Sequence, residues 1–259
     1  MHEKIKFYKY QGAGNDFILI DNRQHVFEPQ NSALVKKMCD RKFGIGADGL
    51  MLLQETDEAD FEMIYFNANG LQASMCGNGG RCIVAFARDL KIIEHRTDFL
   101  AVDGLHFAQI KGNEVALSMI DVLEYRRDSD AYILQTGSPH YVKITTDVEN
   151  LDVYNAGRKI RYSQTYSPEG INVNFVEQEQ AGYFVRTYER GVENETLACG
   201  TGATAAAISI AINENRTGTI EIPIRVLGGQ LQVSFERDEN SFTKVILQGP
   251  AEYVFEGTY

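Results

Sequence analysis

Basic residues are scarce in this sequence. Its 259 residues include 25 lysines and arginines against 36 aspartates and glutamates, which gives a formal net charge of −11. Proteins that bind nucleic acid or an anionic membrane surface need clustered Lys and Arg side chains. We therefore expect no nucleic-acid or membrane partner, and a small molecule is the expected ligand.

Long apolar runs are also missing. The first residues, MHEKIKFYKYQGAGND, carry charges where a secretory signal needs an apolar core. The longest nearly apolar run, residues 203–212, is too short to span a bilayer. From these two features we expect a cytoplasmic protein.

Cysteine is rare, and its spacing argues against both disulfides and metals. The chain has four cysteines, at positions 39, 76, 82 and 199, too few for a disulfide framework without an export signal. There is no C-x-x-C pair of the kind that binds zinc. No glycine-rich dinucleotide fingerprint is present, and no lysine lies in a recognisable pyridoxal phosphate context. We expect no metal and no cofactor.

The hydrophobic pattern predicts many short strands and a few helices. Alternating segments such as KIKFYKYQ and GYFVRTYERG are typical of strands. Helical spacing is found in four places, at residues 32–41, 75–93, 151–163 and 199–215. The chain is long enough for two domains of ordinary size.

An internal repeat divides the chain into two similar halves. The turn GAGND precedes Cys76 by nearly the same distance as GSPH precedes Cys199, and IYFNANG and VRTYERG each lie a few residues before their cysteine. We predict an N-terminal domain at residues 1–122 and a C-terminal domain at residues 123–259, of which about 250–259 could return to the first domain. Paired domains create a cleft, where small-molecule sites are often found.

Both halves place a cysteine directly before a glycine-rich helix start. MCGNGGRC contains Cys76, and ACGTGA contains Cys199. A helix start offers unpaired backbone N–H groups and a partial positive charge, which bind anions and lower the pKa of a thiol. Each junction therefore combines a binding site for a carboxylate with an activated thiol.

Two such junctions indicate acid–base chemistry. A single one would suggest a cysteine nucleophile with an oxyanion hole. With two, one thiolate can remove a proton from an α-carbon while the other thiol protonates the opposite face, which inverts the stereocentre. The helix starts would stabilise the enediolate-like charge that develops on the carboxylate.

Four motifs carry a resemblance to a known family. GAGNDF, FNANG…MCGNGGRC, GINVNFV and YERGVENETLACGTGA resemble, in order and over essentially the whole chain, the motifs of the diaminopimelate epimerases, which are pyridoxal-phosphate-independent amino acid epimerases. The resemblance implies an α+β fold of two similar domains. Each would be a highly curved mixed or antiparallel sheet wrapped around a central helix, and pseudo-twofold symmetry would relate them. It also suggests a homodimer.

The resemblance also implies roles for individual residues. Cys76 and Cys199 would be the acid and base that interconvert LL- and meso-diaminopimelate, with His140 and Glu189 near the thiols. The reacting carboxylate would bind the backbone amides of four residues: Gly77, Asn78, Gly200 and Thr201. The rest of the substrate would be read by five side chains: Asn15, Asn67, Asn172, Glu189 and Arg190. By charge and geometry, Arg190 suits a carboxylate and Glu189 an ammonium group.

Three positions depart from the family pattern. Ser138 stands where the family usually has Asn before Pro-His, so one substrate hydrogen bond is either lost or made by a hydroxyl. One additional residue lies between Arg190 and Cys199 compared with many members. Gly49 stands where some members have a Gln that contacts the ligand.

Simpler interpretations exist for every residue. A lone Cys-Gly-x-Gly is more often an ordinary helix entry, and Cys39 and Cys82 fit packing positions. The asparagines could serve turns, His140 could be an ordinary turn histidine, and Glu189 and Arg190 could form a surface ion pair. The alternatives for the whole protein are a proline- or hydroxyproline-type racemase and a non-catalytic module that binds an anionic metabolite. Arg190, together with the asparagines, argues against such a racemase because it provides for a second charged end of the substrate. Two activated thiols argue against a non-catalytic module.

Overall fold

The computed structural model describes residues 4–259, which form two compact units. The first runs up to Leu117 and also includes Gly249–Tyr259, and the second is Ser118–Gln248. The sequence-based boundary after residue 122 lies slightly later than this division. The reason is that residues 119 and 122 are already hydrogen-bonded to β-strand residues of the second unit. The Met119 amide donates to the Val245 carbonyl and the Val122 amide to the Phe242 carbonyl, both at 2.8 Å.

Within the described residues, the first unit consists of nine strands and two helices, and β8 ends at its boundary. Its elements are β1 (Lys6–Gly12), β2 (Asn15–Asp21), α1 (Ser32–Cys39), β3 (Gly49–Gln54), β4 (Phe61–Asn67), β5 (Gln72–Ala73), α2 (Gly77–Asp89), β6 (Arg96–Ala101), β7 (Gly104–Lys111), β8 (Glu114–Ser118) and β18 (Glu252–Thr258).

The second unit is also built mainly from strands. Its elements are β9 (Arg126–Asp128), β10 (Ala131–Gln135), β11 (Pro139–Ile144), α3 (Val153–Arg161), β12 (Asn172–Glu179), β13 (Gly182–Glu189), β14 (Asn194–Thr196), α4 (Gly200–Asn213), β15 (Gly218–Val226), β16 (Gly229–Asp238) and β17 (Ser241–Pro250). The three shortest strands, β5, β9 and β14, were not anticipated from the sequence, because two or three residues are too few to show alternation.

The two units repeat one order of strand pairing. In the first, β1 and β2 are antiparallel, β2 and β3 parallel, β3 and β4 antiparallel, and β4 and β6 parallel. In the second, the same relations hold for β10 and β11, β11 and β12, β12 and β13, and β13 and β15. The predicted α+β class, with two similar units, is confirmed.

In each unit, one further strand pairs with the first strand of this repeated order. β18 lies antiparallel to β1, and β9 lies antiparallel to β10. The chain therefore returns to the first unit at its end, and β18 completes the sheet there.

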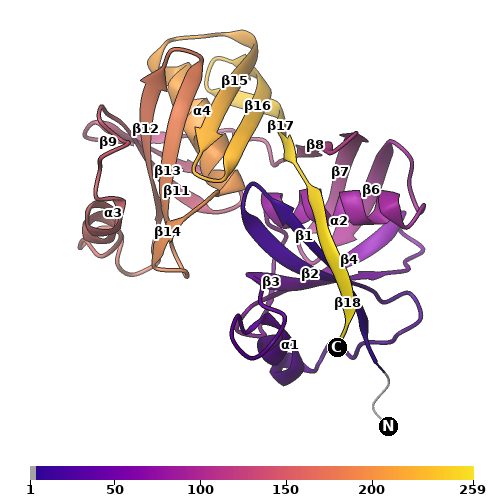
Figure 1. Ribbon diagram of the computed structural model, residues 1–259. Coiled ribbons are helices and arrows are strands. Elements are labelled where there is room, and N and C mark those ends of the chain that lie inside the picture. The colour runs from indigo at the N-terminus through magenta and orange to yellow at the C-terminus, as the bar shows by residue number, and fades with distance from the viewer. Residues whose placement is uncertain (1–3) are drawn as a thin grey trace. The chain divides into compact units, whose positions relative to one another are not determined.

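Each unit surrounds one long helix with strands (Figure 1). Helix α2 contacts β1, β2, β3, β7 and β18, and α4 contacts β10, β11, β12, β13, β15 and β16. Residues 77–87 of α2 are buried, and so is almost all of α4, including the apolar run 203–212. A helix with no polar face is stable only when strands cover it on all sides, as here. Among residues 4–259, no helix is long and apolar enough to cross a membrane.

Candidate functional site

The two repeated cysteines are the N-caps of the two central helices. Cys76 precedes α2 with φ −108° and ψ 146°, and Cys199 precedes α4 with φ −121° and ψ 111°. Extended backbone at this position is typical of an N-cap, which leaves the N–H groups of the first turn without helical partners. The sulfur of Cys76 accepts a hydrogen bond from the Gly79 amide at 3.2 Å. The sequence-based expectation that both cysteines lie at helix starts agrees with these positions.

A glycine lets each sulfur lie against its helix. A Cβ on Gly79 would meet the sulfur of Cys76 at 3.2 Å, and a Cβ on Gly202 would meet the sulfur of Cys199 at 3.3 Å. Both distances are tighter than ordinary contacts to a side-chain carbon. The second glycine of each C-G-x-G motif therefore makes room for the thiol.

A hydrogen-bonded chain of amides leads from the start of α2 to Asn15. The Asn78 side chain donates to Asn15 Oδ1 at 3.2 Å, and Asn15 Nδ2 donates to Asp48 at 2.5 Å. Arg41 in turn binds the carboxylates of Asp48 and Asp16 at 2.7 and 2.6 Å. Burial alone would raise the pKa of Asp16, but the hydrogen bonds from Arg41 and Lys9 outweigh it and hold that pKa below its usual range.

A fully buried arginine lies within the first turns of α2. Arg81 is 0% exposed and donates to the Gly77 carbonyl at 3.2 Å, to Asn78 Oδ1 at 3.0 Å and to the Pro250 carbonyl at 3.3 Å. Burial lowers the pKa of the Arg81 guanidinium, and negative charge at Cys82 or Cys76 would raise it. Arg81 is therefore a buried positive charge near Cys76.

Asn67 ends β4 beside a position that has no room for a side chain. Asn67 Oδ1 accepts a hydrogen bond from the Tyr65 hydroxyl at 2.9 Å, and Asn67 is the cross-strand partner of Gly49. A Cβ on Gly49 would approach the Tyr65 ring to 2.5 Å and the Phe66 carbonyl to 2.6 Å. Position 49 therefore has no room for a longer side chain in this structure.

His140 is buried on β11 in a polar surrounding. Its Nε2 lies 2.9 Å from Thr201 Oγ1, and its Nδ1 lies 3.0 Å from the Asn174 amide nitrogen. Burial, followed by the positive charge of Arg190, lowers the pKa of His140 from 6.5 to about 3. The ring is thus neutral at physiological pH.

Asn172 forms hydrogen bonds with both Ser138 and Arg190. Its Nδ2 donates to Ser138 Oγ at 2.8 Å, and its Oδ1 accepts from the Arg190 amide at 2.8 Å. The Ser138 hydroxyl is therefore part of the hydrogen-bonded network around Asn172. Arg190 also donates from its guanidinium to the Glu169 carbonyl at 2.9 Å, and Glu189 accepts a hydrogen bond from the Thr196 hydroxyl. The loop with the additional residue closes as a turn between Glu189 and Asn194.

Within each unit, most of the predicted residues lie together. In the first unit Asn78, two residues after Cys76, is hydrogen-bonded to Asn15. In the second unit His140 contacts Thr201 at the start of α4, and Asn172 contacts Arg190. Three residues of these networks were missed by sequence reasoning: Asp48, Arg81 and Asn174. Only Asn174 had a usable signal, since strand alternation puts it on the same face as Asn172.

The other two cysteines are packing residues. Cys39 and Cys82 are free, buried thiols, at 3% and 0% exposure. Burial raises the pKa of Cys39 to about 12 and raises that of Cys82 further. Neither thiol ionises at neutral pH, as their expected packing role requires. Within residues 4–259, no group of three or more His, Cys, Asp or Glu side chains is arranged to hold a metal ion.

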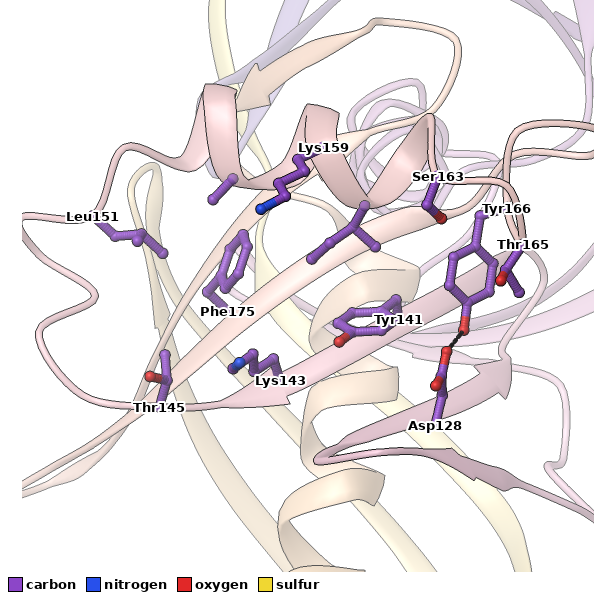
Figure 2. Close-up of a pocket in the computed structure, with 12 residues that line it drawn as sticks. Asp128, Tyr141, Lys143, Thr145, Leu151, Lys159, Ser163, Thr165, Tyr166 and Phe175 are labelled. Atoms are coloured by element: carbon purple, nitrogen blue, oxygen red, sulfur yellow. Dashed lines mark hydrogen bonds between the residues drawn. The ribbon is translucent and has the colours of Figure 1, made fainter.

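A separate cavity of about 580 Å³ lies on the other face of β11 and β12, beneath α3 (Figure 2). Tyr141 and Phe175 line it, next in sequence to His140 and Asn174 on the same strands. Because neighbouring strand residues point to opposite faces, this cavity and the His140 network are separated by the sheet itself.

Sequence comparisons match one family over most of the chain. A sequence model for the family described as diaminopimelate epimerase matches residues 7–92 and 132–254. The diaminopimelate epimerase of Flavobacterium psychrophilum is 53% identical over 256 residues, which covers 98% of this chain and 100% of the relative. Those of Chlorobaculum tepidum and Aquifex aeolicus are 40% and 38% identical, and the matches cover 95% and 98% of this chain and 98% and 97% of the relatives.

Solved structures share the fold at low sequence identity. A phenazine biosynthesis protein of the PhzF family from Bacillus anthracis aligns with a TM-score of 0.80 and 14% identity, over 99% of both chains. A hydroxyproline epimerase from Agrobacterium vitis, with bound trans-4-hydroxy-L-proline, aligns with a TM-score of 0.71 and 14% identity, over 99% of this chain and 91% of that one. These likenesses concern the fold alone.

The buried neutral His140 predicts a pH dependence of stability. Between pH 6.5 and about 3 the unfolded chain binds a proton at this residue that the folded chain does not, so the free energy of unfolding falls as pH falls. The contribution is at most about 1.4 kcal/mol per pH unit. Chemical denaturation between pH 6 and pH 4 should show a steeper loss in the wild type than in His140→Gln.

The exposed His95 offers a matched control, because its side chain is 79% exposed. His95→Gln should keep the wild-type dependence on pH. Equal slopes for the wild type and His140→Gln would show that burial does not depress the pKa of this histidine.

Proposed function

The chain belongs to the diaminopimelate epimerase family, and on that premise we propose that it interconverts LL- and meso-2,6-diaminopimelate, a step in the supply of lysine and peptidoglycan precursors. It is an epimerase that acts without pyridoxal phosphate. The observation that carries the proposal is the cysteine at the N-cap of the central helix in each of two similar units. A repeated thiol at a repeated helix start suits a reaction that needs one base and one acid.

The proposed reaction exchanges one proton on one carbon. A thiolate, Cys76 or Cys199, takes the α-proton and becomes a thiol, and the electron pair left on carbon delocalises into the substrate carboxylate. The other cysteine, as a thiol, then delivers its proton to the opposite face and becomes the thiolate. No net oxidation or reduction occurs, and the two cysteines exchange roles with the direction of reaction.

The first-turn amides are proposed to stabilise the charge that develops. The N–H groups of Gly77, Asn78, Gly200 and Thr201 belong to the helix starts, where unpaired donors and the helix dipole favour an anion. A carboxylate that gains negative charge in the transition state would strengthen these hydrogen bonds at that moment. The burial of Arg81 behind Gly77 and Asn78 adds a positive charge that favours the same step.

The distant end of the substrate is proposed to bind side chains from both halves of the sequence. Arg190, which is exposed, offers a guanidinium for the second carboxylate, and Glu189 offers a carboxylate for the second ammonium group. Asn15, Asn67 and Asn172 would supply neutral hydrogen bonds. Asp48, Tyr65 and Ser138 respectively hold their amide groups in place.

His140 and Glu189 are proposed to set the protonation of the thiols. For His140 the pKa of about 3 excludes a role as a cation at neutral pH, so it would act as a neutral hydrogen-bonding group. Its contact with Thr201, the second residue of α4, supports a role close to Cys199.

We also propose that the protein is a cytoplasmic homodimer. The reaction depends on reduced thiols, which the cytoplasm maintains. The side chains of Tyr253, Val254 and Phe255 on β18 are 50%, 50% and 44% exposed, and adjacent exposed apolar residues of this kind mark interaction surfaces.

Solvent hydrogen should enter the substrate during turnover. With LL-diaminopimelate in deuterated water and a reducing agent, mass spectrometry should find deuterium at the α-carbon, and the meso form should accumulate. Proline and trans-4-hydroxy-L-proline serve as control substrates and should show no exchange. Exchange with these and none with diaminopimelate would refute the proposed substrate.

Each cysteine should be necessary for inversion. Cys76→Ala or Cys199→Ala should lower the epimerisation rate by about 10²- to 10⁴-fold, because a general acid or base is lost. Any remaining α-proton exchange should be confined to one stereoisomer, a different one in each variant. Cys82→Ala, a change at a buried packing thiol, should leave inversion measurable, and full activity in either of the first two variants would rule out the two-base assignment.

Strand β18 should support dimer formation. Sedimentation equilibrium at micromolar concentration should give a dimer for the wild type, and Phe255→Glu should weaken association at least tenfold by placing a charge in an apolar contact. Leu105→Glu changes another exposed apolar residue, at 61% exposure on β7, and should leave the dimer intact. A monomeric wild type would contradict the proposal.

A further inference from the structure

A chain of hydrogen-bonding groups leads across the second unit to the sulfur of Cys199. Asn174 Nδ2 lies 3.0 Å from His140 Nδ1, and His140 Nε2 lies 2.9 Å from Thr201 Oγ1. Thr201 Oγ1 lies 3.5 Å from the sulfur of Cys199. The direction in which these groups donate decides whether the sulfur receives a hydrogen bond.

The amide of Asn174 has only one orientation that satisfies its neighbours. Its Nδ2 donates to the Tyr141 carbonyl at 3.1 Å, and a carbonyl can only accept. Its Oδ1 accepts from the Thr187 hydroxyl at 2.9 Å. Asn174 is 0% exposed, so no solvent competes for these groups. The second N–H of Nδ2 is therefore directed at His140 Nδ1.

This orientation selects the tautomer of His140. A proton on Nδ1 would face an N–H of Asn174, so Nδ1 must accept and the proton of the neutral ring lies on Nε2. Nε2 then donates to Thr201 Oγ1. The Asn172 amide approaches Nε2 only to 3.4 Å and has a shorter hydrogen bond to Ser138 at 2.8 Å, so it does not compete for Nε2.

The Thr201 hydroxyl, once it accepts from His140, has its own proton to give. The sulfur of Cys199 lies within reach, and a thiolate is the better acceptor of a hydrogen bond. When Cys199 is a thiol, the second lone pair of the same hydroxyl can accept from S–H. The chain thus stabilises the thiolate without blocking protonation.

The first unit has different residues at the equivalent places. Met51 on β3 is the cross-strand partner of Tyr65 on β4. Asn174 on β12 is in the same way the cross-strand partner of Thr187 on β13, so Met51 is the equivalent of Asn174. The helix glycines agree with this equivalence. A Cβ on Gly79 would meet the Met51 sulfur at 3.3 Å, and a Cβ on Gly202 would meet Asn174 Oδ1 at 2.5 Å.

The equivalent of the histidine is also apolar in the first unit. Phe17 is the parallel partner of Gly49, as His140 is the parallel partner of Asn172. Neither the Phe17 side chain nor the Met51 side chain has an N–H or O–H to donate. The Asn174–His140 arrangement is therefore a feature of the Cys199 side.

We propose that Asn174 is a positioning residue that holds His140 in its Nε2-protonated form, so that the Thr201 hydroxyl donates to the Cys199 thiolate. The inference rests on the proposed function, in which Cys199 acts as a base. Asn174 itself acts through His140 and Thr201.

The tautomer can be observed directly by NMR on the full-length protein without substrate. In protein labelled with ¹⁵N-histidine, His140 should show a protonated Nε2 and an unprotonated Nδ1 at pH 7, with the signal assigned by its loss in His140→Gln. Asn174→Leu removes the donor and keeps a similar volume, so the Nδ1-protonated form should appear. A protonated Nδ1 in the wild type, or no change in Asn174→Leu, would overturn the proposal.

The effect on the sulfur can be measured by alkylation with iodoacetamide, again without substrate. Mass spectrometry of the Cys199 peptide as a function of pH gives the apparent pKa of this thiol. Loss of one hydrogen bond to a charged group should raise it by about one to two units in Asn174→Leu and in Thr201→Val. Thr201→Ser keeps the hydroxyl and should keep the wild-type value.

A second buried asparagine controls for general destabilisation. Asn22 is 0% exposed and bonds to both backbone groups of Phe27, far in sequence from either cysteine, so Asn22→Leu should leave the Cys199 profile unchanged. An unchanged profile in Thr201→Val would overturn the final step of the proposal. Neither the NMR measurement nor the alkylation measurement uses substrate. Absence of diaminopimelate turnover would therefore refute the proposed function without changing the result for the His140 tautomer or the Cys199 thiol.

Discussion

The rest of the structure depends on the burial of two helix starts. The first turns of α2 and α4 leave N–H groups that the helix cannot satisfy, and both turns are enclosed by strands. An enclosed, partly positive helix start is stabilised by negative charge. The residue placed there is a cysteine in both units, which can carry that charge as a thiolate, and the glycine three positions later makes room for its sulfur.

The environments of the two cysteines differ although their backbone settings repeat. Cys76 lies near a buried arginine that holds the start of α2, and its neighbouring strand supplies Met51. Cys199 lies near a polar network built on β11 and β12, in which His140 is neutral. The reaction that we propose needs each thiol to ionise. The means that we propose differ between the units: a buried cation near Cys76 and a directed hydrogen bond to Cys199.

Much of the fold was predictable because its signals are local. Alternation located the long strands, and helical spacing located the four helices found within residues 4–259. The departures at Ser138 and Gly49 could be seen in the sequence but not interpreted. Ser138 takes a hydrogen bond from Asn172, and Gly49 is required by contacts with Tyr65 and Phe66. Both explanations depend on residues from neighbouring strands, which sequence distance does not reveal.

The sequence by itself determined the repeated motif, the two cysteines and the family to which they point, because these are patterns of adjacent residues. Tertiary structure decided which partners surround those residues. Strand pairing brought Asn174 to His140 and folding brought Arg81 to complete burial, so that the surroundings of one buried charge and one buried imidazole are set by neighbours distant in the chain. Ionisation depends on burial and on nearby charges and donors, and these exist only once the chain is folded.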